Sequence, residues 1–195
     1  MPYDRIQLAS ASLRRSLLLR QIGVAHDIRP VDLDESRHPG ESPGDYVLRL
    51  ARAKAEAVAA AGNRLPVLAA DTTVAMGAEI FGKPLDAADG IRMLAALSGR
   101  CHEVLTAVAV CRDGQVATTL SETRVTFRVL SVADCRDYWA TGEPAGKAGA
   151  YAVQGLGAVF IARLEGSYSG VMGLPLFETA ELLDAAGVRR WQVVE

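Results

Sequence analysis

Cysteine, histidine and long hydrophobic runs are all scarce in this sequence of 195 residues. The three cysteines, Cys101, Cys111 and Cys135, are odd in number and lack the spacing of metal ligands, so we expect neither a disulfide framework nor a structural zinc site. The three histidines stand singly, which gives no zinc-binding spacing and no obvious hydrolase triad. With neither a signal peptide nor a membrane-spanning stretch in view, a reducing cytoplasm is the expected location.

A strong excess of one charge is also lacking. The formal net charge is −2, which argues against a long polyanion such as duplex DNA as the main partner, and no membrane partner is expected. A local basic cluster can still hold a small phosphorylated ligand. Half of the residues are hydrophobic, enough for a sizeable core, and neither a repeat nor a flexible linker divides the chain. We therefore expect a single domain over residues 1–195.

Hydrophobic periodicity and the positions of Gly, Pro and Asp predict a mixed α/β fold with an antiparallel component. The expected strands cover residues 6–9, 26–30, 65–70, 102–112 and 115–129, with a further strand after the last helix. The expected helices cover residues 12–22, 43–61, 86–97, 131–141 and 176–186. Asp113-Gly114 is typical of a type I′ hairpin turn between two long strands.

The segment LASASLRR at 8–15 places two serines and two arginines where a short strand turns into a helix. Free N–H groups and the helix dipole favour an anion at such a helix start. Arg14 and Arg15 repel each other and the dipole unless a polyanion faces them, and Arg suits bidentate phosphate contacts. The alternative is that Ser12 merely caps the helix while both arginines point into water.

Lysine is rare here, because only three of the 21 basic residues are lysines. Lys54 falls on the apolar face of the helix expected over 43–61, where a lysine must either extend to solvent or meet an anion. Lys83 lies in FGKP, and Lys147 lies in a glycine-rich segment. We interpret Lys54 and Lys83 as functional and leave Lys147 open.

Asp71 follows a short apolar run that predicts a strand buried on both faces. A carboxylate at the carboxyl end of such a strand opens into the crevice where α/β sheets bind ligands, although an Asp that closes a turn is an equal alternative. Either Asp34 or Glu35, in the acidic loop at 32–35, can join Asp71 in holding a hard cation. A solvated charge run is the other interpretation of this loop.

Two glycine-rich stretches superficially resemble phosphate-binding motifs. The stretch from Gly142 to Ala148 has three residues instead of four between its glycines and no Ser or Thr after Lys147, so it is not a P-loop. Gly155-Leu156-Gly157 lacks the third glycine of a dinucleotide-binding fingerprint. Covalent catalysis is not indicated either.

Seven stretches match a known family in order and spacing: LASASLRR at 8–15, RLARAKA at 49–55, LAADTTV at 68–74, FGKP at 81–84, LSGRCHEVLTAVAV at 97–110, GEPAGKAGAYAVQGLGAVFI at 142–161 and GSYSGVMGLPLFE at 166–178. In these stretches the chain resembles the Maf family of nucleoside triphosphate pyrophosphatases. The resemblance implies a single Maf-like domain with an inosine-triphosphatase-like fold, in which two lobes flank a nucleotide cleft, often in a homodimer. It also implies hydrolysis of a nucleoside triphosphate to the monophosphate and pyrophosphate, assisted by a divalent metal such as Mg²⁺ or Mn²⁺.

The resemblance also assigns roles to single residues. It makes Asp71 the proton acceptor and Glu35 a metal-associated residue, with the metal shared between them. The positions that contact the triphosphate are Ser10, Arg14, Arg15, Lys54 and Lys83. Two departures from the family pattern stand out, because Leu13 replaces a proline and Gly146 replaces an Asp, which makes a catalytic or metal role at 146 doubtful.

Base preference is predicted from Arg14, Thr72 and Gln154, where the chain is similar to the subgroup that acts on dTTP and UTP. The Gln amide offers a donor and an acceptor to N3–H and O4 of uracil or thymine, whereas the glutamate of the 7-methyl-GTP subgroup only accepts. Because the amide can flip, cytosine stays possible on this argument alone. The alternatives are a broader or 7-methyl-GTP-directed pyrophosphatase, or a nucleotide-binding regulator of cell division and septum formation without turnover.

Overall fold

A single sheet organises the computed structural model, which describes residues 2–62 and 64–192. The sheet has seven strands in the order β2-β1-β3-β5-β6-β7, with β4 beside β3. The strands are β1 Ile6–Leu8, β2 His26–Ile28, β3 Val67–Met76, β4 Glu79–Phe81, β5 Cys101–Arg112, β6 Gln115–Phe127 and β7 Ile161–Glu165. β1 is parallel to β2 and β3, and the other pairs are antiparallel. The predicted mixed α/β sheet is therefore confirmed.

All five predicted helices are present. The helices are α1 Leu13–Gln21, α2 Pro43–Ala60, α3 Ala87–Leu97, α4 Val132–Ala140, α5 Tyr168–Met172 and α6 Leu176–Ala185, with short 3₁₀ turns η1 Ala148–Ala150 and η2 Leu156–Phe160. Ser12, Ser42, Asp86 and Ser131 cap the first four helices by accepting a backbone N–H three residues on. The sequence missed α5, β4, β7 and both 3₁₀ turns. No helix in the described part of the chain is long and apolar enough to cross a bilayer.

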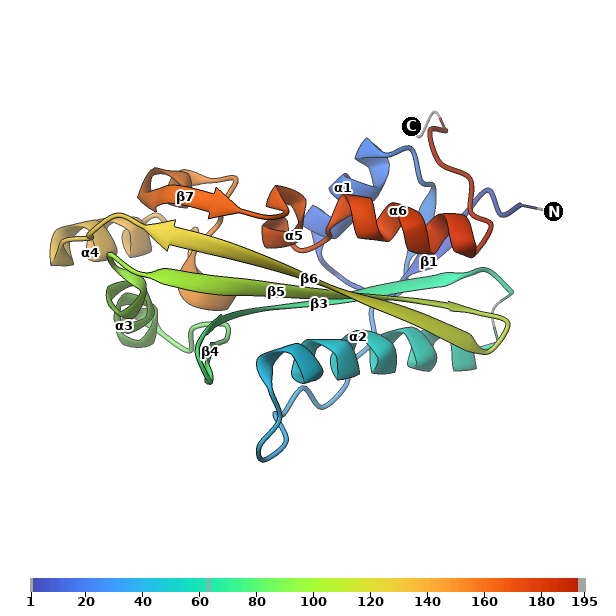
Figure 1. Ribbon diagram of the computed structural model, residues 1–195, viewed down its shortest axis with the longest axis horizontal. Coiled ribbons are helices and arrows are strands. Elements are labelled where there is room, and N and C mark those ends of the chain that lie inside the picture. The colour runs from blue at the N-terminus through green and yellow to red at the C-terminus, as the bar shows by residue number, and fades with distance from the viewer. Residues whose placement is uncertain (1, 63, 193–195) are drawn as a thin grey trace.

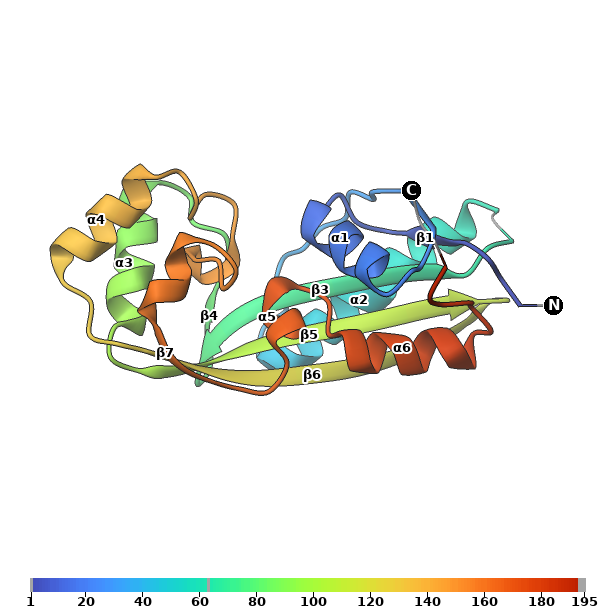
Figure 2. The same cartoon turned by 90° about the horizontal axis from the view of Figure 1, so that it is seen from above.

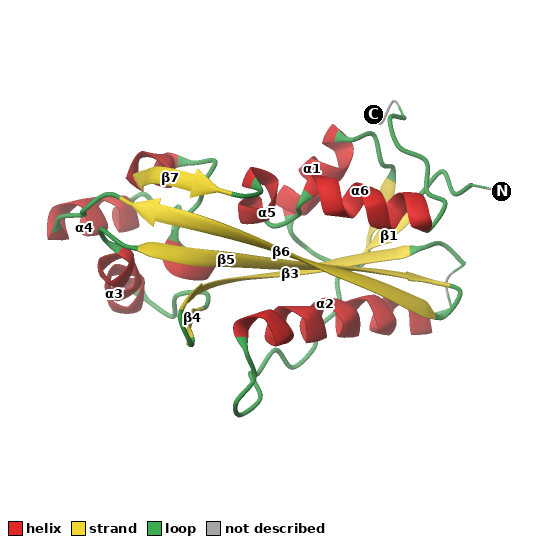
Figure 3. Ribbon diagram, in the orientation of Figure 1, coloured by secondary structure: helices red, strands yellow, loops and turns green. Residues whose placement is uncertain are grey.

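Helices cover both faces of the long strands. α2 packs on one face of β3, β5 and β6, while α1, α5 and α6 lie over the other (Figure 1). Seen from above, α3, α4 and β7 gather at one end of the strands and α1, β1 and α6 at the other (Figure 2). The same two groups are visible when helices and strands are coloured separately (Figure 3). The long strands therefore join the two lobes that the family resemblance implies.

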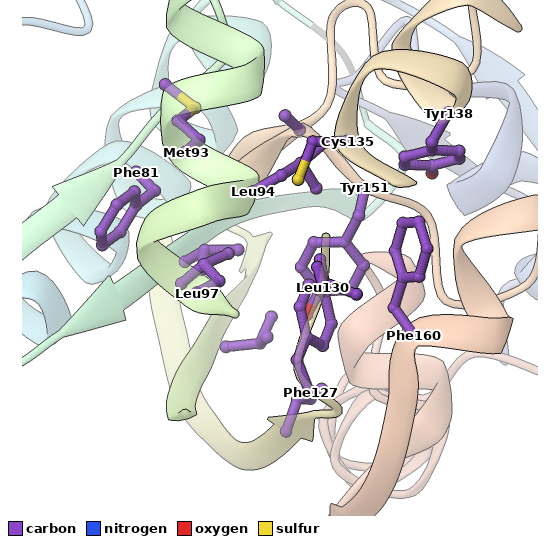
Figure 4. Close-up of a cluster of buried hydrophobic side chains, with 14 residues drawn as sticks. Phe81, Met93, Leu94, Leu97, Phe127, Leu130, Cys135, Tyr138, Tyr151 and Phe160 are labelled. Carbon is purple, nitrogen blue, oxygen red and sulfur yellow. The ribbon is translucent and has the colours of Figure 1, made fainter. Parts of the chain in front are cut away.

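Each lobe has its own apolar core. One cluster of buried side chains lies under α3 and α4 and includes Leu94, Phe127 and Phe160 (Figure 4). A second cluster packs α1 and α6 on the sheet through Leu18 and Leu183, and a third lies under α2. Because β3 and β5 contribute to all three clusters, the position of one lobe relative to the other is set by these continuous strands.

Two predictions about strands were wrong. β3 does not end before Asp71 but continues to Met76, so Asp71 lies within the strand. The reason is that β5 pairs with β3 over nine residues and holds the polar segment extended beyond the apolar run. The strand predicted after α6 is reduced, in the described part of the chain, to one bridge between Tyr3 and Val188. The rest of that prediction falls on residues 193–195, which lie outside the described residues.

The other edge of β3 is only partly paired, and this decides where a site can form. β1 pairs with β3 as far as Leu68, and β4 pairs with it again from Val74. Between these pairings, residues 69–73 have no strand beside them on this side among the described residues. Asp71 therefore faces a crevice for a reason that the sequence did not predict: the neighbouring strand stops, although β3 itself does not.

Candidate active site

A cavity of about 1090 Å³ opens between the two lobes at the unpaired edge of β3. Its lining contains all nine residues predicted from the sequence, namely Ser10, Arg14, Arg15, Glu35, Lys54, Asp71, Thr72, Lys83 and Gln154. They come from six separate segments of the chain. The structure therefore brings the predicted set together in one place, while the role of each residue stays a prediction.

Lys54 lies at the floor of this cavity and is the centre of its charge arrangement. Its side chain projects from the buried face of α2 and is 10% exposed. The ammonium nitrogen lies 2.6 Å from Asp71 Oδ1 and 2.5 Å from Glu35 Oε1. Of the two outcomes expected for a lysine on an apolar face, the structure shows the meeting with an anion. A buried ammonium of this kind requires such pairing, because taking an unpaired charge out of water is costly.

The two carboxylates differ in their environment. Burial raises the pKa of Asp71, and the opposing pull of Lys54 and Arg15 does not cancel this effect. Glu35 is more exposed, so its smaller burial penalty is outweighed by Lys54 and Lys83, and its pKa is lowered. Asp71 is therefore the better proton acceptor of the pair, while Glu35 stays ionised more readily.

Hydrogen bonds from α2, which the sequence analysis missed, hold the acidic loop next to the cavity. Arg49 of α2 holds both carboxylate oxygens of Glu41 at 2.6 and 2.8 Å and donates to the Ser36 carbonyl at 3.0 Å. The Tyr46 hydroxyl donates to the Glu35 carbonyl at 3.0 Å. Arg49 belongs to the RLARAKA stretch. Its position five residues before Lys54 on the same helix was the sequence signal for this role.

The sequence left a choice between Asp34 and Glu35, and their side chains point in different directions in the structure. Asp34 Oδ1 accepts the Ser36 N–H at 2.9 Å, in a local turn that uses its carboxylate. Glu35, the next residue, reaches Lys54 instead. Glu35 is therefore the carboxylate of this loop that faces Asp71 across the ammonium.

Arg15 is held by protein groups on three sides. Its guanidinium donates to Ser10 Oγ at 3.1 Å, Thr72 Oγ1 at 3.2 Å and the Gly173 carbonyl at 2.9 Å. Burial lowers its pKa, with Asp71 opposing that effect, and an arginine keeps its charge under such a shift. Ser10 Oγ also accepts the Ser12 N–H at 3.2 Å. The alternative in which both arginines point into water is wrong for Arg15.

The remaining cations line the cavity wall. Arg14 is half-buried, and its Nε–H donates to the Met172 carbonyl at 3.2 Å. The other N–H donors of its guanidinium stay available to a ligand in the cavity. Lys83 is exposed in the cavity lining and forms no hydrogen bond or ion pair with a described residue. Lys147, whose role was left open, donates to the Glu143 carbonyl while lining the cavity. Gly146 lies in the lining with no side chain to contribute a ligand.

Thr72 is connected to a buried polar residue that the sequence analysis did not single out. Thr106 of β5 is 1% exposed, and its hydroxyl lies 3.0 Å from Thr72 Oγ1 and 2.8 Å from the Gly170 carbonyl. It ties β3 to α5, whose C-terminal end supplies carbonyls to both arginines. The signal was a lone threonine within the apolar run LTAVAV.

Gln154 lies on the opposite lobe from α1. Its side chain is exposed in the cavity, and no hydrogen bond to it is present among the described residues. A free amide can give a ligand one acceptor and one donor group. The cavity thus has one side with Lys54, Asp71 and Glu35, and another side where Gln154 and Tyr151 lie with the single charge of Lys147.

Protein side chains alone do not form a complete metal site among the described residues. Among residues 2–62 and 64–192, no group of three or more His, Cys, Asp or Glu side chains is placed to hold a metal ion by itself. Mg²⁺, however, is usually held by one or two carboxylates together with substrate phosphates and water. Asp71 and Glu35 already share one cation at 2.5–2.6 Å, so this pair of oxygen ligands fits an ion that a phosphorylated ligand helps to bind.

A mixed α/β sheet whose cleft combines several cations with two carboxylates defines a protein that binds a phosphorylated ligand. The sequence agrees with this class, because the model of the Maf family, described as Maf-like protein, matches residues 5–186. The chain belongs to the Maf family.

Relatives cover almost the whole chain. It is 55% identical over 186 residues to the dTTP/UTP pyrophosphatase of Methylobacillus flagellatus, an alignment that covers 94% of each chain. It is 53% identical over 193 residues to the dTTP/UTP pyrophosphatase of Bordetella parapertussis, covering 94% of this chain and 93% of the relative. Among solved structures, the Staphylococcus aureus Ham1 protein aligns with a TM-score of 0.44 at 15% identity, over 63% of this chain and 71% of that one.

Proposed function

We propose that this protein hydrolyses nucleoside triphosphates, with dTTP and UTP preferred, to the monophosphate and pyrophosphate. The observation that carries the proposal is the Lys54 ammonium between Asp71 and Glu35, at the floor of a cavity lined by further cations. Binding of a triphosphate alone requires no proton acceptor, which is the role proposed for Asp71. Relatives at 53% and 55% identity named dTTP/UTP pyrophosphatase support the same activity.

In the proposed reaction, water attacks the α-phosphorus in line with the leaving pyrophosphate. Asp71 accepts the proton of that water, a role that its raised pKa favours. Lys54 keeps Asp71 in place through the contact of 2.6 Å. Arg14, Arg15 and Lys83 stabilise the negative charge on the pyrophosphate, and such positioning and electrostatics account for most of the catalysis in phosphoryl transfer.

A divalent cation belongs to this proposal. Asp71 and Glu35 would hold it together with oxygens of the triphosphate, and when bound it would neutralise charge on the phosphates. The chain's own contribution is to hold both carboxylates beside one another, because Lys54 contacts Asp71 at 2.6 Å and Glu35 at 2.5 Å.

The preference for uracil and thymine is proposed from the side of the cavity where Gln154 lies. The Gln154 amide is free to pair with N3–H and O4 of the base. Arg14 and Thr72, across the cavity, are proposed to set the position of the nucleotide with it.

The test is a pyrophosphate-release assay with a panel of purine and pyrimidine triphosphates, in Mg²⁺ or Mn²⁺ and in excess EDTA. We expect release with dTTP and UTP, loss of release in EDTA and recovery when metal is restored. The absence of release with every nucleotide would overturn the enzymatic function and leave a binding protein. Equal rates with purines and pyrimidines would overturn the role of Gln154 alone.

A further inference from the structure

We propose that Tyr138 and Glu143 are positioning residues that present Gln154 to the base of the nucleotide, an inference that rests on the proposed function. The Tyr138 hydroxyl of α4 donates to Glu143 Oε1 at 2.7 Å. We call this hydrogen-bonded pair the Tyr138–Glu143 bracket. Neither residue reaches the unpaired edge of β3 or belongs to the cavity lining, so both would act through Gln154.

The bracket holds the chain on both sides of Gln154. Two residues before it, the Ala152 N–H donates to the Tyr138 hydroxyl oxygen at 3.1 Å. Two residues after it, the Leu156 N–H donates to Glu143 Oε2 at 2.9 Å, and the next N–H donates to Oε1 at 3.0 Å. The last two N–H groups begin η2, whose N-cap residue is a glycine without a capping side chain. The Glu143 carboxylate thus supplies the cap from outside the turn.

The glycines around Gln154 fit the bracket closely. A Cβ on Gly155 would lie 2.1 Å from Glu143 Oε2, and one on Gly157 would lie 2.6 Å from the Tyr138 hydroxyl. This explains Gly155-Leu156-Gly157, which is not a dinucleotide-binding fingerprint. Both glycines let the backbone approach the bracket.

The bracket is itself rigid. The Tyr138 ring packs edge-on against Phe160 at 5.0 Å between centroids, within the cluster under α3 and α4 (Figure 4). Partial burial of Glu143 is outweighed by hydrogen bonds from Tyr138 and the two amides, so the pKa of Glu143 is lowered and its carboxylate stays ionised. Gln154 is therefore a free side chain on a backbone fixed at both ends, which reduces the entropy lost when it orders on a base.

The experiment compares Glu143→Gln and Tyr138→Phe with the wild type, using kcat/KM for UTP and for GTP from pyrophosphate release. In Glu143→Gln an NH₂ group faces the Leu156 N–H, so a donor meets a donor. We expect the UTP-to-GTP ratio of kcat/KM to fall about tenfold in Glu143→Gln and less in Tyr138→Phe, as the loss of one or two hydrogen bonds implies. Inhibition by inorganic tripolyphosphate, which has no base, should be unchanged. Glu181→Gln, at an exposed position of α6, is the matched control.

A double variant separates positioning from general structural damage. In a Gln154→Ala background, Glu143→Gln should leave the UTP-to-GTP ratio at the value that Gln154→Ala alone gives. The inference is overturned if Glu143→Gln keeps the wild-type ratio, or lowers it equally without Gln154. Should Glu143→Gln fail to fold, Tyr138→Phe decides by the same criteria, together with hydrogen exchange at the Leu156 amide, which should accelerate. If the wild type releases no pyrophosphate, the proposed function is overturned instead. If hydrogen exchange at the Leu156 amide is slow in the wild type and equally slow in the variants, the positioning role of the Tyr138–Glu143 bracket is overturned.

Discussion

The replacement Asp71→Asn tests the proposed general base with almost no change in shape. The Asn side chain keeps an oxygen where Asp71 Oδ1 lies 2.6 Å from Lys54 Nζ, but it accepts no proton from water. Loss of a general base lowers turnover by about 10²–10⁴-fold. Because Asp71 is also proposed to hold the metal, we expect a fall of at least about 10³-fold, or about 4 kcal/mol in activation free energy.

Folding stability should change far less. A hydrogen bond to a charged group contributes about 1.5–3 kcal/mol and a neutral one about 1 kcal/mol, so Lys54 loses about 1–2 kcal/mol of interaction. It keeps Glu35 at 2.5 Å. The raised pKa of Asp71 shows that its charge is costly to bury, and the neutral amide avoids that cost. We therefore expect the free energy of unfolding to fall by at most about 2 kcal/mol.

The assay combines three measurements on one preparation. Pyrophosphate release gives turnover, calorimetric titration with UTP gives binding, and urea unfolding gives stability. Asp137→Asn, at an exposed position of α4, controls for the substitution itself. Turnover of Asp71→Asn near the wild-type value would refute the role of Asp71 as base. A loss of UTP binding as large as the loss of turnover would show that Asp71 serves binding instead of chemistry.

Three further predictions concern pH, charge and packing. Asp71 must be deprotonated to accept a proton, and its pKa is raised. We therefore expect kcat/KM to rise with pH along an acid limb centred above about 3.9, the ordinary pKa of Asp. A limb centred at or below that value would contradict the role of Asp71 as base. Lys54→Met should raise the pKa of Asp71 further and move the same limb to higher pH, so an unmoved limb in a folded variant would show that Lys54 does not tune the base. Gly90→Ala should lower the free energy of unfolding by about 1–3 kcal/mol with turnover retained, because the added Cβ would lie 2.1 Å from the Trp139 ring. Urea unfolding measures this change. A more stable variant would mean that the gain in helix propensity outweighs the clash.

The helices were predictable because their signals are local. Ser12, Ser42 and Ser131 stand before apolar periodicity, and each one caps the helix that was expected there. The hairpin was predictable for the same reason, since Asp113 and Gly114 both adopt the positive φ that a type I′ turn requires. The strand β3 was not, because its second half is extended only through pairing with β5.

The site shows the same division. A lysine on an apolar helix face predicts an anionic partner from the sequence, because an unpaired buried charge is costly. Which anion it meets depends on the loop after β2, whose direction is fixed by Arg49 and Glu41. Thr106 and the Tyr138–Glu143 bracket were missed because the backbone groups that they bind, those of Gly170, Ala152 and Leu156, lie 13 to 64 residues away in the chain.

The sequence by itself determined the family, the mixed α/β class, the capped helices and the set of residues that line the cavity. These follow from short motifs, composition and periodicity, which depend on near neighbours in the chain. Only the tertiary structure decided that Asp71 faces a crevice because β1 stops beside β3, that Lys54 joins Asp71 to Glu35, and that Gln154 is held from both sides. Such arrangements arise from pairing and packing between distant segments, whose free energy is gained only when the whole sheet and both lobes have formed.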